Sequence, residues 1–372
     1  MSLNVLIAPD KFKGTLTARQ AAEAIAEGWK KARPADNVTL LPISDGGDGF
    51  GEILADLWSA NERTVRAMDA AHRPLGARWW WEPNRKAAII ESATVIGLAQ
   101  LPPKRFHPFD LDTYGLGKVI GAASRQGAQR CLIGIGGSAT NDGGFGMAVA
   151  LGWQFLDAAG RTIEKWTDLK KLESIVAPEA SRFFEKVTVA VDVQNPLLGK
   201  NGASRIYGPQ KGLQPRDFLK AEESLRRLAH IVKQDLGLDL KNAPGGGAAG
   251  GLGFGLAAFL GARLDPGFHL FAREARLATK LRGADLVITG EGRLDESTAM
   301  GKGVGELARL SRQMGIPCVG LAGEVVPARK LKIFAKTGGI TDLTNVQMAK
   351  KRPHFWLARL AHALAGRWVA KA

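Results

Sequence analysis

The segment from Cys131 to Gly152, with the sequence CLIGIGGSATNDGGFGMAVALG, restricts the possible folds more than any other part of the chain. It begins with an unbroken apolar run, which is typical of a buried strand in a parallel sheet. Glycines and small polar residues follow, and Asp142 is placed to cap a helix through Met147 and Leu151. Unpaired amides and the helix dipole favour negative charge at such a turn. The segment therefore predicts a strand, an anion-binding turn and a helix.

The ligand of this turn is left open by its local sequence. Gly134, Gly136 and Ala139 match the G-x-G-x-x-G/A dinucleotide fingerprint, and Asp157 follows at nearly the distance needed to bind a ribose. An NAD(P)-dependent oxidoreductase is therefore one alternative. The same turn also suits a phosphate group of another kind, which we favour, or a purely structural connection between strand and helix.

The composition, with 45% hydrophobic and 23% charged residues, is that of an ordinary globular protein. A length of 372 residues is sufficient for two domains with substantial cores. The formal net charge of +15 is compatible with a non-catalytic protein that binds anions or nucleic acid. However, no aromatic-basic recognition module or zinc-binding spacing accompanies the charge, so we expect no nucleic-acid partner.

Neither the N-terminus nor the charge-free segment of this sequence is typical of a membrane protein. The N-terminal residues MSLNVLIAPDKFKG have no basic region ahead of their short apolar run, so we expect a cytoplasmic protein. Residues 244–262 carry no charge, but their many glycines favour a closely packed helix within a domain, and we expect no membrane partner. Cys131 and Cys318 lie in expected buried strands, which indicates inert core thiols.

Strands and helices alternate at both ends of the chain. Residues 3–9 and 38–43 are expected strands, and between them Thr17 can cap a helix from Ala18 to about Lys31. The alternation returns in ADLVITG, in a helix from Val304 to Met314, and in IPCVGLAG. We therefore expect an α/β fold in which residues 1–62 and 280–372 form one open parallel sheet of the Rossmann or flavodoxin type.

Residues 63–279 are expected to form a larger inserted α/β domain with a mixed sheet. From about Arg63 the sequence alternates like antiparallel strands with a turn near Pro74. Trp79, Trp80 and Trp81 must point to both faces of such a strand, so at least one should be partly exposed or at an interface. The loop after VTVAVDV follows a buried strand directly, and we expect it to be a binding loop.

Charged residues gather directly after the expected strands. Asp10, Asp45 and Asp192 each close a buried strand, where a carboxylate without a ligand or partner is costly. Phosphoryl transfer needs cations and amides around a polyphosphate, carboxylates for Mg²⁺ and a base at the accepting hydroxyl. No Ser or Thr follows Lys302, so there is no Walker A motif, and none of the six histidines lies in a glycine loop. The groups are Asp10 with Lys13; Asp45 with Asp48; Asp192 with Lys211; and Glu291 with Arg293, Asp295 and Lys302.

Nine motifs, spanning residues 8 to 303 in order, carry a resemblance to a known family. They are APDKFKGTLTA, SDGGDG, ESATVIGLA, TYGLG, IGIGGSATNDGGFGM, VDVQNPLLGKNGAS, YGPQKG, GGGAAGGLGFG and VITGEGRLDESTAMGKG. Through them the chain resembles the class I glycerate kinase family. The resemblance implies two unlike α/β domains around an active-site cleft, and ATP- and Mg²⁺-dependent phosphorylation of D-glycerate, mainly at the 2-hydroxyl. The chain departs from the family pattern at Lys11, where serine is usual, at Asp48, where glutamate is usual, and at Lys118, where an acidic residue is usual.

The resemblance and the strand-end positions together suggest a role for each charged residue. Asp192 or Asp45 would act as the base, while Lys13 and Arg293 would hold the glycerate carboxylate or neutralise the phosphates. Asp10 and Asp295 would bind the metal. The residues expected to contact the nucleotide are Gly136, Gly137, Ser138, Asn141, Lys211, Glu291 and Lys302. We expect 2-phosphoglycerate as product, with 3-phosphoglycerate less favoured, from a monomer or homodimer.

Overall fold

The computed structural model describes residues 2–298 and 303–368. The chain divides into two compact units: unit 1 comprises Met1–Asp45 with Phe268–Ala372, and unit 2 comprises Gly46–Gly267. A domain inserted between the two chain ends is what the alternation of elements predicts, but both boundaries lie earlier than the expected residues 62 and 280. Lys302, one of the predicted nucleotide-binding residues, lies outside the described residues.

The boundaries differ from the expected ones because one helix near each expected boundary belongs to the other unit. Helix α2 (Phe50–Trp58) packs on β4 (Pro74–Glu82) and β5 (Ala87–Glu91), so it belongs to unit 2. Helix α11 (Leu277–Arg282) lies in unit 1. The change of pattern near Arg63 thus marks the first antiparallel strand and not the crossing between units.

Unit 1 is built on a five-stranded sheet with the order β13-β12-β11-β1-β2. Every neighbouring pair in it is parallel. The strands are β1 (Asn4–Ile7), β2 (Asn37–Leu40), β11 (Leu286–Leu294), β12 (Cys318–Val325) and β13 (Lys336–Gly339). This confirms the predicted parallel sheet formed from both chain ends.

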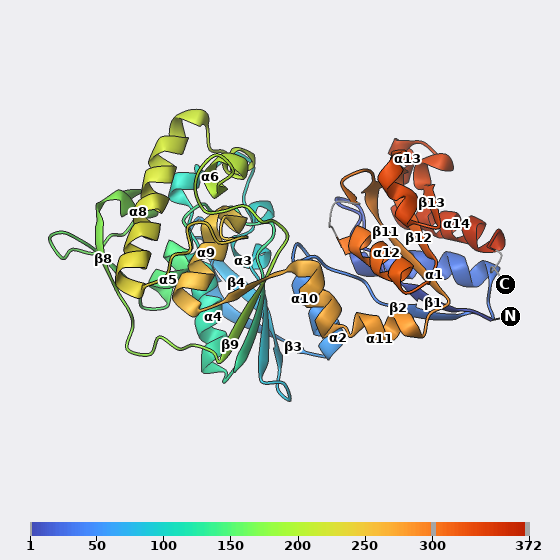
Figure 1. The fold of residues 1–372 in the computed structure, drawn as a ribbon, viewed down its shortest axis with the longest axis horizontal. Coiled ribbons are helices and arrows are strands. Elements are labelled where there is room, and N and C mark those ends of the chain that lie inside the picture. Colours follow the sequence, from blue (N-terminus) through green and yellow to red (C-terminus); the bar gives the residue numbers. More distant parts are fainter. Residues whose placement is uncertain (1, 299–302, 369–372) are drawn as a thin grey trace. The chain divides into compact units, whose positions relative to one another are not determined.

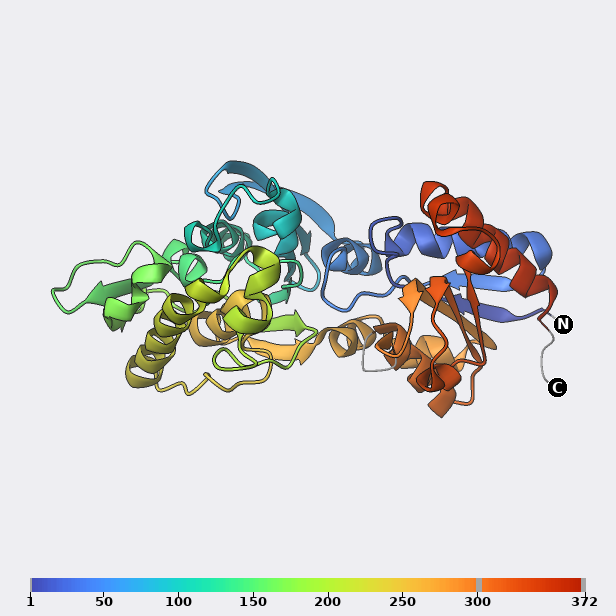
Figure 2. The same cartoon turned by 90° about the horizontal axis from the view of Figure 1, so that it is seen from above.

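Helices cover both faces of this sheet (Figures 1 and 2). Helices α1 (Ala18–Ala32) and α14 (Pro353–Gly366) pack against each other and bury Ile25 and Leu357 in one apolar cluster with β1, β11 and β12. Helix α12 (Gly303–Gln313) packs on β11 and β12. The remaining helices of unit 1 are α10 (Gly267–Glu274), α11 and α13 (Val346–Lys351).

The start of α1 follows the prediction made from its capping residue. Thr17 accepts a hydrogen bond from the Gln20 amide, and the Gln20 side chain accepts one from the Thr17 amide, which forms a capping box. Strand β11 is longer than predicted, since it continues to Leu294 through the polar sequence GEGRL. Its extension is held by β12, where Arg293 pairs with Glu324 and Leu294 pairs with Val325.

Unit 2 is built on a six-stranded sheet with the order β10-β9-β6-β5-β4-β3 (Figure 1). Strands β3, β4 and β5 are antiparallel, whereas β5, β6, β9 and β10 run parallel, so the predicted mixed sheet is confirmed. A separate two-stranded sheet pairs β7 with β8. The further strands are β3 (Asn61–Met68), β6 (Arg130–Gly134), β7 (Gln154–Asp157), β8 (Leu172–Val176), β9 (Lys186–Val191) and β10 (Arg263–Pro266).

The three consecutive tryptophans of β4 are all buried, with 3%, 4% and 8% of their surface exposed at Trp79, Trp80 and Trp81. The expectation that one of them is partly exposed is therefore wrong. Trp79 and Trp81 belong to the main core of unit 2, and Trp80 on the opposite face lies directly against Gly51 of α2. Both faces of the sheet are covered at this point, which the local sequence does not reveal.

The charge-free segment, residues 244–262, contains α9 (Ala248–Leu260), which lies in the interior of unit 2. Gly250 has a φ of +72°, and a Cβ atom there would lie 2.0 Å from the carbonyl oxygen of Thr140. The glycines thus allow this segment to touch the backbone that follows β6. Among the described residues no helix is long and apolar enough to cross a membrane, and the cytoplasmic location stays a prediction.

The other helices of unit 2 are mostly short. They are α3 (Ala93–Ile96), α4 (Tyr114–Arg125), α5 (Phe145–Ala150), α6 (Ala203–Ile206), α7 (Gly208–Lys211) and α8 (Phe218–Leu236). The two cysteines are free and buried, as predicted, and burial raises the pKa of both thiols.

Candidate active site

Three carboxylates meet at the carboxyl end of the unit 1 sheet. Asp10 follows β1, Asp45 follows β2 and Glu291 lies in β11, and all three are half-buried. We call these three residues the acidic edge. The backbone ties Asp10 to β11, since the Asp10 amide donates to the carbonyl of Gly290 at 2.8 Å. The strands of the parallel sheet therefore bring these side chains to one place. The expectation that Asp45 closes a buried strand is wrong, because β2 ends at Leu40 and is mostly exposed.

The electrostatics of the acidic edge confirm that its members interact. Burial, followed by the charge of Asp45, raises the pKa of Asp10 to about 7, and Glu291 adds to this shift. Lys11 opposes it, because a neighbouring cation favours the charged carboxylate.

Three further predicted residues of unit 1 lie on or beside β11. Arg293 is exposed, and its Nε atom lies 3.6 Å from an oxygen of Asp295 and 3.7 Å from an oxygen of Glu324. Asp295 accepts hydrogen bonds from the amide and hydroxyl of Ser297 at 2.8 and 2.6 Å. These bonds lower the pKa of Asp295. Lys13 is exposed in the turn after β1, next to Gly292 of β11.

The acidic edge suits a divalent cation by its charge. Carboxylate oxygens are ligands that Mg²⁺ prefers, and in kinases Mg²⁺ keeps several waters while binding one or two carboxylates and the substrate phosphates. Within residues 2–298 and 303–368, no group of three or more His, Cys, Asp or Glu side chains is arranged to hold a metal by itself. The residues therefore fit a cation that arrives with its phosphates better than a site made of protein ligands alone.

A second set of predicted residues lies at the carboxyl end of the parallel strands in unit 2. Gly134 at the end of β6 pairs with Ala190 of β9, so the turn after β6 and Asp192 after β9 share this edge. Asp48 joins them, because a Cβ atom on Gly137 would lie 2.7 Å from its carboxylate oxygen. Asp48, Gly137 and Asp192 are exposed.

The rest of the turn is mostly buried, and most of its polar groups bond within the protein. The exception is the buried side-chain oxygen of Asn141, which has no hydrogen-bond partner among the described residues. We call residues 135–144 the β6–α5 loop. The amide of Gly136 donates to the carbonyl of Gly46 at 3.2 Å. Ser138, with 5% of its surface exposed, shares its hydroxyl with that of Thr140 at 3.0 Å. Asn141 is fully buried and donates to the hydroxyl of Ser204 at 2.9 Å. Only the tip of the predicted phosphate-binding turn thus faces solvent, and direct nucleotide contacts by Ser138 and Asn141 stay a prediction.

Asp142 anchors the start of α5, but the N-cap of this helix is Gly144, whereas the sequence predicted Asp142. One of its oxygens accepts from the Gly146 amide at 2.9 Å and from the amide and hydroxyl of Thr113 at 2.9 and 2.7 Å. Burial and the charge of Asp112 raise the pKa of Asp142 to about 6, although these hydrogen bonds oppose the shift. Asp142 is therefore a structural carboxylate that holds the β6–α5 loop on α4 and α5.

Lys211 ends helix α7 and points into the same interior. Only 7% of its surface is exposed, and its Nζ atom donates to the carbonyl oxygen of Thr140 at 2.6 Å. Burial lowers the pKa of Lys211 to about 7, while the charge of Asp142 opposes this shift. The sequence groups Lys211 with Asp192 after β9, but Lys211 is buried whereas Asp192 is exposed.

The loop after β9 is held by its own contacts. The Tyr207 hydroxyl donates to the side-chain oxygen of Asn195 at 2.6 Å, and the Asn195 amide donates to the carbonyl of Asn201 at 2.8 Å. An ordered loop is what a binding role requires, and that role stays a prediction.

Sequence reasoning missed Glu91 and Thr113 as organising residues of unit 2. Glu91 closes β5 and accepts from the amides of Gly49 and Gly51 at 3.0 and 2.9 Å, so it binds the start of α2. Its position directly after a buried strand is the same signal that identified Asp10. Thr113 directly precedes a helix, which is the position of a capping residue. Its hydroxyl donates a hydrogen bond to Asp142.

The structure does not support Asp157 as the ribose-binding residue of a dinucleotide site. Asp157 ends β7, which belongs to the small two-stranded sheet and not to the sheet that contains β6. Its carboxylate accepts from the amides of Ala159 and Arg161 and from the guanidinium of Arg161 at 2.9 Å. Asp157 is a turn residue.

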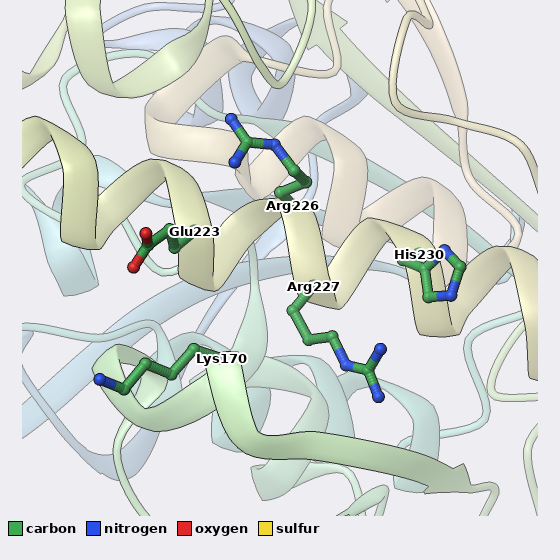
Figure 3. A pocket seen from close by; sticks show the side chains of 5 residues that line it. All are labelled: Lys170, Glu223, Arg226, Arg227 and His230. Carbon is green, nitrogen blue, oxygen red and sulfur yellow. The ribbon is translucent and has the colours of Figure 1, made fainter.

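A hollow on α8 contains none of the predicted site residues. It is lined by Lys170, Glu223, Arg226, Arg227 and His230. Figure 3 shows these side chains pointing in different directions instead of converging on one point. Arg227 is already bonded to the carbonyl of Leu172 and to Glu173. The hollow therefore adds no residue to the candidate site.

The comparisons with known proteins agree with this architecture. The model of the glycerate kinase family matches residues 5–369. Glycerate kinase from Halalkalibacterium halodurans is 39% identical over 326 residues, which cover 86% of this chain and 85% of that protein. Glycerate 2-kinase from Escherichia coli is 37% identical over 326 residues, covering 87% and 86%.

A solved structure gives the same result for the fold. The crystal structure of a proposed glycerate kinase 2 from Salmonella typhimurium LT2 matches with a TM-score of 0.85 and 34% identity over 98% of each chain. The match extends over the five-stranded parallel sheet and the mixed sheet alike, and the family model covers the acidic edge and the β6–α5 loop. The chain therefore belongs to the glycerate kinase family, whose members are ATP-dependent kinases.

Proposed function

We propose that this protein transfers the γ-phosphoryl group of ATP to the 2-hydroxyl of D-glycerate. The observation that carries the proposal is the acidic edge, where Asp10 interacts with Asp45 and with Glu291 of β11. Phosphoryl transfer requires such carboxylates, both for the metal that accompanies ATP and for the accepting hydroxyl. The relatives named glycerate kinase support D-glycerate as the acceptor.

In the proposed reaction the glycerate hydroxyl oxygen forms a bond to the γ-phosphorus of ATP. The bond between that phosphorus and the oxygen bridging to the β-phosphate breaks, and ADP leaves. The hydroxyl proton passes to a carboxylate, for which Asp45 and Asp192 are the candidates. Asp45 is half-buried beside Asp10, whereas Asp192 is exposed at the end of β9, so the surroundings favour Asp45 as the base.

The cations of unit 1 suit the anionic parts of both substrates. Lys13 and Arg293 are exposed beside β11, and a guanidinium group matches the planar carboxylate of D-glycerate. We assign Asp10 to the Mg²⁺ that accompanies ATP, which would neutralise the phosphate oxygens. Asp295 is a weaker candidate for this role, since Ser297 already occupies one of its oxygens twice.

The position of the transferred phosphate rests on the relative from Escherichia coli, which is named glycerate 2-kinase. We therefore propose 2-phosphoglycerate as the product. The test is incubation of the purified protein with MgATP and D-glycerate, followed by NMR identification of the phosphorylated acid. A phosphate on the 2-hydroxyl supports the proposal. A phosphate on the 3-hydroxyl would keep the kinase and overturn the isomer, and formation of no ADP would overturn both.

The same experiment addresses the metal. Removal of Mg²⁺ with EDTA is expected to abolish turnover, and readdition of Mg²⁺ to restore it, because the phosphates need charge neutralisation in the transition state. Turnover that persists in EDTA would contradict the proposed cofactor.

A further inference from the structure

We propose that Lys211 is a positioning residue for phosphoryl transfer: its buried ammonium group holds the β6–α5 loop in the conformation that receives the nucleotide phosphates. This inference rests on the proposed function and deepens it. It assigns to Lys211 an action through the loop in place of the direct phosphate contact that its sequence position suggests.

The first argument is the cost of the residue. Lysine is almost never fully buried unless it is paired, and an apolar side chain of similar length would fill the same space without a desolvation cost. Lys211 is nevertheless only 7% exposed. Its Nζ atom donates to a backbone carbonyl at 2.6 Å. The desolvation cost at this buried position indicates that Lys211 does more than fill space.

The second argument is the atom that Lys211 contacts. Its acceptor is the carbonyl of Thr140, at the centre of the β6–α5 loop. Thr140 in turn binds Ser138 twice, since the Thr140 amide donates to the Ser138 hydroxyl at 3.2 Å and the two hydroxyls lie 3.0 Å apart. Ser138 directly follows the exposed tip at Gly137. The Lys211 amine is therefore linked to the solvent-facing end of the turn through Thr140 and then Ser138.

The third argument is that contacts other than the Lys211 hydrogen bond also fix the loop. Asp142 holds the loop to α5 and Thr113, and Gly250 of α9 lies against the Thr140 carbonyl. Lys211 approaches that same carbonyl as a charged donor. Since the amine also places a positive charge near the turn, it favours an anion there without touching it.

The test uses Lys211→Met, which removes both charge and donor, and Lys211→Gln, which keeps a donor but removes the charge. Lys233→Met on α8 is the matched control, because Lys233 is an exposed lysine of the same unit that pairs with Asp239. For each protein we would measure kcat, KM for ATP, KM for D-glycerate and Tm. The loss of one charged hydrogen bond leads us to expect kcat/KM for ATP about 10- to 100-fold lower in Lys211→Met.

The positioning role predicts a specific pattern among these measurements. KM for D-glycerate should stay unchanged in Lys211→Met, Lys211→Gln should recover part of the loss, and Lys233→Met should equal the wild type. Equal kcat/KM for ATP in Lys211→Met and wild type would overturn the inference. So would a double variant Lys211→Met/Asp142→Asn that regains both Tm and activity, since charge balance alone would then explain the effect. If Lys211→Met does not fold, the comparison of Lys211→Gln with wild type decides.

A failure of the proposed function gives a different result. If the wild type does not turn over MgATP and D-glycerate, the function is wrong, and calorimetric binding of ADP then tests Lys211 separately. A dissociation constant about tenfold higher in Lys211→Met supports the positioning role, and an equal constant overturns it.

Discussion

The acidic edge of unit 1 and the β6–α5 loop of unit 2 have the same kind of sequence, an apolar strand followed by small and acidic residues, but different chemistry. In the acidic edge, Asp10 and Asp45 are half-buried and repel each other. In the loop, Asp142 is fully buried and bonded to Thr113 and Gly146. One region gathers half-buried carboxylates at a sheet edge, and the other uses its carboxylate to hold its own backbone.

The difference follows from where the acid stands relative to the end of its strand. Asp10 and Asp45 lie in the segments that directly follow the ends of β1 at Ile7 and β2 at Leu40. Asp142 comes after a turn that has already brought the chain back to the start of α5. An acid at a strand end is thus a candidate for chemistry, whereas an acid after the turn is a candidate helix cap.

The largest expected effect is that of Asp45→Asn on activity. Loss of a general base lowers kcat by about 10³-fold, while Tm should not fall, since the substitution removes a charge that repels Asp10. Steady-state kinetics and thermal unfolding measure the two quantities. Asp110→Asn, a change of an exposed aspartate in unit 2, is the control.

Asp192→Asn separates the two candidates for the base. If Asp192→Asn shows the large loss and Asp45→Asn does not, the base belongs to unit 2. Near-normal turnover in both variants would remove the base from the acidic edge and from β9 alike.

The next effect concerns stability in unit 2. Gly250→Ala places a Cβ atom 2.0 Å from the Thr140 carbonyl oxygen at a residue whose φ is +72°. Overpacking against backbone and an unfavourable left-handed conformation together should lower the free energy of unfolding by about 3 kcal/mol. Urea unfolding measures this value.

Gly261→Ala is the matched control for that prediction. Gly261 also has a left-handed conformation, with a φ of +61°, but nothing lies within 4 Å of its Cβ position. It should lose only about 1 kcal/mol, from the backbone conformation. Equal losses in the two variants would mean that the contact between α9 and the loop is not tight.

A smaller effect is expected from the titration of Asp142. Its pKa is about 6 in the folded protein against 3.8 in the unfolded chain, so the folded state binds the proton more tightly. The wild type should therefore gain stability relative to Asp142→Asn as the pH falls from about 6 towards 3.8. Between pH 7 and pH 4.5 the gain amounts to about 2 kcal/mol. Urea unfolding of both proteins at the two pH values measures it, and a difference that is independent of pH would contradict the buried state of Asp142.

The buried central strands of both sheets could be predicted because their signal is local, whereas the edge strands β10 and β13 were not predicted. The apolar runs at Val5–Ile7 and Leu286–Ile288 are buried parallel strands, and the capping sequence from Thr17 starts α1. Features that depend on distant partners could not be predicted. β11 continues through polar residues because β12 pairs with them, and Trp80 is buried because α2 covers it.

The residues of the candidate site likewise divide into those that the sequence predicts and those whose surroundings depend on tertiary packing. Asp10, Asp45 and Glu291 were identified because parallel strands bring their carboxyl ends together, which follows from the order of elements alone. The burial of Lys211 depends on the packing of α7 against Thr140, and nothing in the sequence YGPQKG distinguishes it from an exposed basic turn. Local patterns thus predict which residues reach a sheet edge, but not which of them the tertiary structure then covers.

The smallest expected effect is that of Asp157→Ala, an acid that belongs to neither region. Asp157 binds Arg161 and the amides of its own turn at the end of β7, outside the sheet that carries the β6–α5 loop. The substitution should leave kcat and both KM values unchanged, and neither wild type nor variant should bind NAD or NADP in a calorimetric titration. Saturable NAD binding that Asp157→Ala weakens would instead restore the dinucleotide interpretation of the Gly134 to Ala139 turn. Because that turn contacts Gly46 and Ile96 and not β7, we expect the two segments to behave independently.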